Sequence, residues 1–183
     1  KEVLQLAKSY NTTLTVMLTS MMLIAFAEEI PLRQKKKPVI LSVPVNLRNY
    51  FQSETARNFF GVIQVGYNFS QGPGTLEDVI ACVKEEFKRE LTAEQLGARM
   101  AALSKAEHNY VARAVPLVIK DLILWTADTI SESYTAGSIS NIGKIDLPEA
   151  AKPFVKRFDV FVSTDKLQAC VCSYGGELTV SFT

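Results

Sequence analysis

The sequence predicts an α/β (α+β) fold, a two-layer sandwich in which helices cover a mixed, largely antiparallel β-sheet. Residues 39–69 hold two runs whose apolar residues alternate with period two, as in strands with one core face. Residues 14–29, 76–89 and 116–130 space their apolar residues as helices do. From Ser133 onward, short apolar runs are separated by turn residues, so strands return after the helices.

Composition sets the size and excludes some partners. With 183 residues, 48% of them hydrophobic, the chain can bury one sizeable core, and we expect a single domain over residues 1–183. Lys and Arg number 20 and Asp and Glu number 19, so no strong field attracts a nucleic acid. The most apolar window, residues 14–27, is shorter than the roughly twenty residues of a membrane span, so no membrane span is expected.

The cysteines and the histidine argue against a metal site. Cys82, Cys170 and Cys172 are an odd number with one C-x-C pair, which is typical of reduced thiols in a cytoplasm. We therefore expect a cytoplasmic localisation, in keeping with the lack of a secretory signal pattern. His108 is the only histidine, and no C-x-x-C or H-x-x-x-H spacing accompanies it, so no metal is expected.

The first elements are helical. Residues 3–7 space like a short helix, and residues 11–13 offer side-chain oxygens that cap the next helix, residues 14–29. Pro31 ends this second helix. Its apolar residues surround most of its circumference, so we expect it to be covered on more than one side. The basic run Lys35 to Lys37 follows, either a solvated loop or a site that attracts phosphate.

Two expected strands meet at a polar junction. The run VILSVPVNLR, residues 39–48, and the run over residues 59–69 each keep one apolar face. Asn46, Arg48, Arg57 and Asn58 gather where one strand ends and the next begins. We expect charge-assisted and amide hydrogen bonds from these side chains to fix the junction.

Capping patterns mark the central helices. Thr75 with Asp78 opens one helix, and Thr92 with Gln95 opens the next, which ends near His108.

Pro116 suits the first turn of a fourth helix with a broad apolar stripe. We expect Trp125, which lies in this stripe, to pack in the core, with stacking on a cofactor as the minor alternative.

The end of the sequence is rich in β-prone runs. They cover residues 137–145, 158–164, 168–174 and 178–183, and Gly175, Gly176 and Glu177 join the last two as a hairpin.

Polar residues in the run YTAGSISNIGKI are candidates for binding. Ser138, Ser140 and Asn141 place hydroxyl and amide groups on an otherwise apolar strand, where each needs a partner. A substrate is one such partner. The alternative, equally weighted, is that these groups bond neighbouring backbone at a bulge marked by Gly137 and Gly143.

No catalytic residue is assigned. His108 is the usual type of general base, but no nucleophile or orienting carboxylate is arranged around it in sequence. Cys170 and Cys172 fall on one face of a strand, where small apolar residues commonly lie.

Four motifs, in this order, resemble the C-terminal half of the CoA-dependent acyltransferase superfamily. They are VPVNLR at 43–48, NFFG at 58–61, SNIG at 140–143 and YGGELTVSF at 174–182. This superfamily includes alcohol acetyltransferases, wax ester synthases, chloramphenicol acetyltransferase and the condensation domains of nonribosomal peptide synthesis. The alcohol acetyltransferase or condensation-like group is the nearest. The helix TTLTVMLTSMMLIAFA also fits the pattern, so the resemblance covers essentially the whole chain.

The resemblance implies a chloramphenicol acetyltransferase-like half and an acyl transfer from CoA, or from a carrier thioester, to an alcohol or amine. Acyl-CoA or the carrier thioester is then the co-substrate, and no permanently bound cofactor is expected. The superfamily's catalytic signature, H-H-x-x-x-D-G, lies in the N-terminal half and is absent here. We therefore expect residues 1–183 to be the C-terminal subdomain of a longer protein, inactive without its N-terminal half.

The resemblance also assigns roles. Ser140 and Asn141, with Ser138 beside them, become candidate substrate-binding donors. The motif residues with an expected structural role are Asn46, Arg48, Asn58 and Gly61. Contact with the substrate is the minor alternative for Asn46, Arg48 and Asn58.

Two alternatives stay open: a non-catalytic condensation-like module that binds an acyl carrier or a lipid, and a purely structural half. We also expect the isolated chain to self-associate through the apolar face left by a missing partner half.

Overall fold

The protein, seen in a computed structural model, is described over residues 2–31, 36–108 and 115–183. The helices in these ranges are α1 (Glu2–Ser9), α2 (Leu14–Glu29), α3 (Leu76–Glu90), α4 (Ala93–Glu107) and α6 (Leu117–Ser133), with the short 3₁₀ helices η1 (Leu47–Asn49) and η2 (Lys152–Phe154). The strands are β1 (Val39–Asn46), β2 (Phe60–Tyr67), β3 (Gly137–Lys144), β4 (Gln168–Tyr174) and β5 (Glu177–Phe182).

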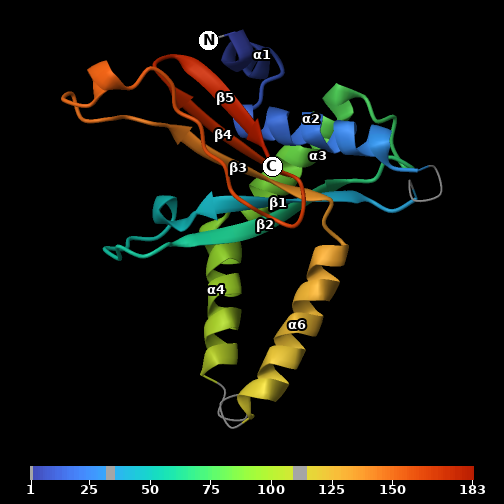
Figure 1. Cartoon of the computed structure of the whole chain (residues 1–183). Coiled ribbons are helices and arrows are strands. Elements are labelled where there is room, and N and C mark those ends of the chain that lie inside the picture. Colours follow the sequence, from blue (N-terminus) through green and yellow to red (C-terminus); the bar gives the residue numbers. More distant parts are fainter. Residues whose placement is uncertain (1, 32–35, 109–114) are drawn as a thin grey trace.

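The five strands form one sheet in the order β2-β1-β3-β4-β5. The outer pairs, β1 with β2 and β4 with β5, are antiparallel, whereas β3 runs parallel to both of its neighbours. Helices α2 and α3 pack together against one face of the sheet (Figure 1). The predicted α+β sandwich with a mixed sheet is therefore confirmed. The chloramphenicol acetyltransferase-like arrangement stays a prediction.

Helix α2 is the centre of the core. It is buried along most of its length and packs against α3 and β1, so the expectation that it is covered on more than one side is confirmed. Two of its buried residues are polar: Thr19 donates to the carbonyl of Thr15 at 2.8 Å, and Ser20 donates to the carbonyl of Val16 at 2.9 Å. Because both hydroxyls bond within the helix, they can be buried without loss of a hydrogen bond.

Helix α3 begins at the predicted cap, but with a modified capping box. Thr75 Oγ1 accepts from the backbone N–H of Asp78 at 3.4 Å. The carboxylate of Asp78 accepts instead from the hydroxyl of Tyr67, at the end of β2. Gly72 leaves room for this contact, because a Cβ there would lie 2.0 Å from the Tyr67 hydroxyl oxygen. The cap of α3 is thus fastened to the sheet.

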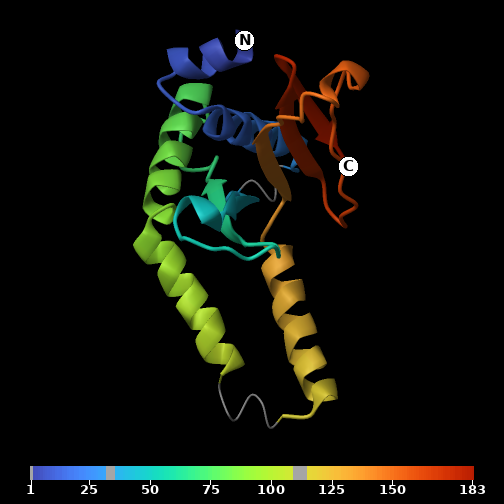
Figure 2. The same cartoon turned by 90° about the vertical axis from the view of Figure 1, so that its left-hand side faces the viewer.

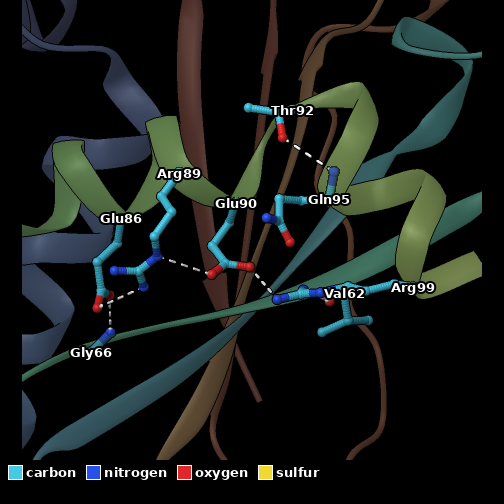
Figure 3. Close-up of polar contacts among 8 residues, drawn as sticks. All are labelled: Val62, Gly66, Glu86, Arg89, Glu90, Thr92, Gln95 and Arg99. Carbon is cyan, nitrogen blue, oxygen red and sulfur yellow. Dashed lines mark hydrogen bonds and ion pairs between the residues drawn. The ribbon is translucent and has the colours of Figure 1, made fainter. Parts of the chain in front are cut away.

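The free edge of the sheet at β2 is partly closed by side chains of α3 and α4 (Figure 3). Glu86 accepts from the backbone N–H of Gly66 at 2.8 Å, and Arg99 donates to the carbonyl of Val62 at 3.2 Å. Arg99 also pairs with Glu90 across the α3–α4 joint. Since unpaired groups on an edge strand invite another strand, these contacts protect the edge and attach the start of α4 to it.

The prediction of a strand over residues 158–164 is wrong. This segment runs without strand pairing along β4 and β5, where Cys172 Sγ contacts the Phe158 carbonyl at 3.4 Å and Thr183 donates to the Val162 carbonyl at 2.7 Å. The segment cannot pair with β4, because β3 and β5 occupy both of its edges. Next to the end of β5, it is held by the side-chain hydroxyl of Thr183 and not by a backbone ladder.

The core position expected for Trp125 is also wrong. Helices α4 and α6 leave the sheet on the same side and extend away from it; we call these two helices the arm (Figures 1 and 2). Trp125 is 65% exposed on α6. The apolar stripe of α6 that we expected to pack is exposed with it, because a periodic pattern identifies a helix but not what covers it.

In the described ranges, no single helix is long and apolar enough to cross a membrane. Helices α1 and α2 reach that length and composition only as a pair, and their axes are bent by 85°.

We expect Tyr67→Phe to lower the free energy of unfolding by about 1–2 kcal/mol at neutral pH, because it removes a partly buried hydrogen bond to a carboxylate. Burial, and secondly the bond to Asp78, raise the pKa of Tyr67 above its usual 10.0. A raised pKa means that the folded state holds the Tyr67 proton more tightly than the unfolded state does. The contribution of this proton to the free energy of unfolding is therefore full below about pH 10 and is lost as pH rises through the folded pKa.

Urea titrations between pH 7 and pH 11 check this prediction. The stability of the wild type should fall more steeply above pH 10 than that of Tyr67→Phe, while Tyr134→Phe, at an exposed tyrosine, should follow the wild type. Parallel curves for the wild type and Tyr67→Phe would contradict it.

Candidate functional site

A pocket of about 870 Å³ lies where the carboxyl ends of the parallel strands β1 and β3 meet the N-terminus of α2. Three of its walls are residues 43–46 of β1, residues 141–143 of β3, and residues 11–13 with Thr15 and Val16 around the start of α2; α3 forms a fourth. In sheets with parallel strands, ligands commonly bind at the carboxyl ends of the strands. This pocket is therefore the candidate site.

Asn141 lies in this pocket and is held by two hydrogen bonds. Its Nδ2 donates to Thr15 Oγ1 at 2.8 Å, and its Oδ1 accepts from the backbone N–H of Gly143 at 2.9 Å. The register of β3 against β4 shifts between Asn141 and Gly143, where Gly143 adopts a φ of 84° that favours glycine. The amide oxygen thus stabilises a bulge, whereas the amide nitrogen ties β3 to α2 and keeps one hydrogen for another acceptor.

The other two predicted donors lie elsewhere. Because side chains alternate along a strand, Ser138 and Ser140 are on the face of β3 opposite to Asn141. Ser138 lines a separate cavity of about 190 Å³ together with Ser42 and Lys166. The structure therefore places Asn141 in the candidate site and does not bring Ser138 and Ser140 to it.

Asn46 and Arg48 shape the junction after β1. Asn46 lines the pocket, and its Oδ1 accepts from the backbone N–H of Arg48 at 3.1 Å, which caps η1. The guanidinium of Arg48 donates to the carbonyls of Thr55 and Arg57 at 2.9 and 2.8 Å. These bonds hold the connection between β1 and β2 in place.

The remaining two motif residues lie outside the pocket. Asn58 is exposed just before β2. Gly61 faces Leu47 of η1, and a Cβ at position 61 would lie 3.3 Å from a methyl carbon of Leu47. A glycine here allows β2 and η1 to approach each other closely.

The pocket is rich in hydrogen-bond donors that the sequence reasoning missed. Lys84 and Lys88, one turn apart on α3, both line it. Lys84 donates to the carbonyl of Asn11 at 2.7 Å, and Lys88 bonds Glu85 at 2.6 Å and lowers the pKa of that carboxyl. In the sequence, only the i, i+4 spacing of the two lysines could have pointed to a shared binding site. Surface helices commonly show this spacing, so it was not distinctive.

The start of α2 adds polarity to the same wall. The hydroxyl oxygen of Thr12 is buried there without a hydrogen-bond partner within the described ranges. The first N–H groups of α2 have no acceptor within the helix, so this end carries a partial positive charge. Among the described residues, the pocket lining contains no histidine, cysteine or carboxylate, so it can bind and polarise a group but supplies no side-chain base of these types.

His108 and the cysteines lie outside the pocket. His108 is exposed at the end of α4, with Nδ1 2.9 Å from the carbonyl of Ser104. Cys170 and Cys172 are buried in β4, and burial, followed by the nearby Asp159, raises the pKa of the Cys172 thiol. Within the described ranges, no group of three or more histidine, cysteine or acidic side chains is arranged to hold a metal ion.

The basic run at residues 35–37 lies away from this pocket. Lys36 and Lys37 are exposed before β1, and Lys35 lies outside the described residues.

A scan against protein-family models finds no match to the chain, and a search of curated proteins finds no significant match.

We expect the Asn141–Thr15 hydrogen bond to stabilise the fold as well as the site. Asn141→Ala and Thr15→Val should each lower the free energy of unfolding by about 1–2 kcal/mol, because each leaves a partly buried polar group without its partner. In a double-mutant cycle measured by urea denaturation, the coupling between them should be about 0.5–1.5 kcal/mol.

Ser140→Ala is the control for this cycle, because it lies on the same strand but on the other face. When Ser140→Ala is combined with Thr15→Val, the two changes in the free energy of unfolding should add. Additive effects of Asn141→Ala and Thr15→Val would show that the bond contributes nothing to stability.

Proposed function

We propose that the chain is the C-terminal half of an acyltransferase that transfers an acyl group from CoA, or from a carrier thioester, to an alcohol or amine. The pocket between β1 and β3 forms part of the acyl-donor channel. One observation carries the proposal: the VPVNLR and SNIG motifs, far apart in sequence, both contribute residues to the wall of this pocket, namely 43–46 and 141–143.

The chemistry of the walls suits an acyl thioester with a long polar arm. Val45 and Ile142 line the pocket and are partly exposed, so they offer apolar surface for the acyl and pantetheine carbons. Lys84 and Lys88 offer positive charge for phosphate groups. A volume of about 870 Å³ falls within the range of roughly 300–1,000 Å³ that is usual for small-molecule sites.

The proposal divides the reaction between two halves. The acceptor's hydroxyl or amine gives its proton to a base as it attacks the thioester carbonyl. The resulting oxyanion then collapses, the C–S bond breaks, and the thiol leaves with a proton. The base is assigned to the H-H-x-x-x-D-G motif of the partner half. This chain contributes hydrogen-bond donors such as Thr15 and the free amide hydrogen of Asn141, which stabilise developing negative charge.

A second function is favoured by the composition of the lining. Among the described residues, those that line the pocket include no histidine and no carboxylate. The pocket therefore suits a non-catalytic module that holds an acyl carrier or a lipid. The two functions differ in one requirement. A longer polypeptide that includes this chain must carry the H-H-x-x-x-D-G motif and transfer acyl groups if the enzyme proposal is right. Cytoplasmic localisation and the lack of a permanently bound cofactor remain predictions.

Binding of acetyl-CoA to the 183-residue chain tests the part of the proposal that both functions share. We expect a Kd of about 0.1–1 mM, typical of half a site, with amide resonance shifts at residues 43–46 and 141–143. Ile142 lines the pocket and is 48% exposed, so Ile142→Trp should fill it and raise the Kd at least about tenfold.

Val62→Trp is the matched control, because Val62 is 45% exposed and does not line the pocket. It should leave the Kd within about twofold. The double variant Lys84→Gln with Lys88→Gln should weaken the binding of acetyl-CoA, because it removes the positive charge near the phosphates. It should not weaken the binding of S-acetylpantetheine, which has no phosphate. Absence of binding, or equal effects of Ile142→Trp and Val62→Trp, would refute the assignment of the pocket.

A further inference from the structure

Helix α6 exposes large apolar side chains on most sides. The residues concerned are Leu117, Val118, Ile119, Leu122, Ile123, Leu124 and Trp125. Because successive residues of a helix are turned by about 100°, these seven are spread around most of the circumference, and Lys120 and Asp121 lie between them. A helix that is apolar all round is normally enclosed by other elements, whereas α3, which lies on the sheet, exposes charged residues instead.

The exposed area is too large for an ordinary monomer surface. Seven such side chains, each about half exposed or more, present on the order of 800 Å². The largest apolar patch of a typical monomer covers about 300–600 Å². One partner's share of a stable protein interface is about 800 Å². The area on α6 therefore matches what one copy contributes to a dimer.

Contacts at the base of the arm attach it to the sheet. Arg99 joins Glu90 to the carbonyl of Val62 where α4 leaves the sheet (Figure 3). Beyond the end of α6, the backbone N–H of Ala136 donates to the carbonyl of Ile40 at 2.8 Å. Both ends of the arm thus join the sheet, and α6 extends away from the core (Figures 1 and 2).

We propose that the partner of α6 is a second copy of this chain, bound through a two-fold symmetric pairing of the two arms. Two α4 and two α6 helices then form a four-helix bundle, in which each α6 is covered from more than one side. In such an antiparallel pairing, Lys120 of each copy comes near Asp121 of the other, because these two residues lie in the middle of the exposed stretch.

The same two charges argue against a lipid bilayer as the partner. Insertion of α6 would carry Lys120 and Asp121 into the hydrocarbon region together with their apolar neighbours, which is costly. This inference does not depend on acyl transfer, because the arm residues that carry it lie outside the candidate pocket.

Sedimentation velocity of the 183-residue chain between about 1 and 100 μM tests the proposal. The wild type should be a dimer in this range. Leu122→Lys with Leu124→Lys places a charge on opposite sides of α6 and, by symmetry, on both copies. We expect the dissociation constant to rise at least about 100-fold. Phe154→Lys, at an 86% exposed site away from the arm, should leave the dimer unchanged.

Trp125 provides a second readout, because it is the only tryptophan in the chain. In the same concentration range its emission should lie at shorter wavelengths in the wild type and in Phe154→Lys, where Trp125 is covered, than in the double lysine variant. Asp121→Cys keeps the apolar residues of α6 and should be cross-linked between copies by a short bis-maleimide, whereas Phe154→Cys should not. This cross-link keeps the test valid if the lysine variant fails to fold.

Three results would overturn the proposal. The first is a wild type that stays monomeric throughout the concentration range. The second is a dimer that survives the double lysine change, which would place the interface on another surface. The third is a monomer that co-sediments with phosphatidylcholine–phosphatidylglycerol vesicles with the Trp125 emission shifted, which would identify a lipid surface as the partner.

Discussion

The burial of α2 is the constraint on which the rest of the structure depends. Its sequence is apolar on nearly all sides, so it needs cover from both the sheet and α3. Thr19 and Ser20 satisfy their hydroxyls within the helix and so allow this burial. Placing α2 across the sheet brings its first turn to the carboxyl ends of β1 and β3. The candidate pocket is thus a direct result of how the most apolar helix is buried.

Local features of the fold were predictable from the sequence because they depend on neighbouring residues. The alternation in residues 39–46 gives a strand with one buried face, and Thr75 and Thr92 accept from the backbone N–H groups of Asp78 and Gln95 as their spacing implies. The Gly175–Gly176 turn adopts the positive φ angles that its hairpin requires. In each case, the residues that decide the structure lie within a few positions of one another.

Features that depend on distant partners were not predictable. Asn141 was recognised as a polar residue in need of a partner, but nothing in the sequence pointed to Thr15, 126 positions away. The β-prone segment 158–164 forms no ladder: β4 already pairs on both sides, and the bond from Thr183 at the end of β5 comes from a side-chain hydroxyl. The stripe containing Trp125 was correctly placed on a helix, yet its environment was wrong. Periodicity defines an element and its faces, whereas topology decides what each face meets.

The pocket and the arm differ in the kind of partner that can bind to them. The pocket presents amide, hydroxyl and ammonium donors beside apolar walls, and directional groups of this kind recognise a small molecule with a defined pattern of acceptors. The first half of helix α6 presents mainly apolar surface, interrupted by Lys120 and Asp121. Apolar surface has no directional groups, so its burial is favoured in proportion to its area. A small ligand buries too little of that surface. On this basis we propose a small-molecule ligand for the pocket and a second copy of the chain for the arm.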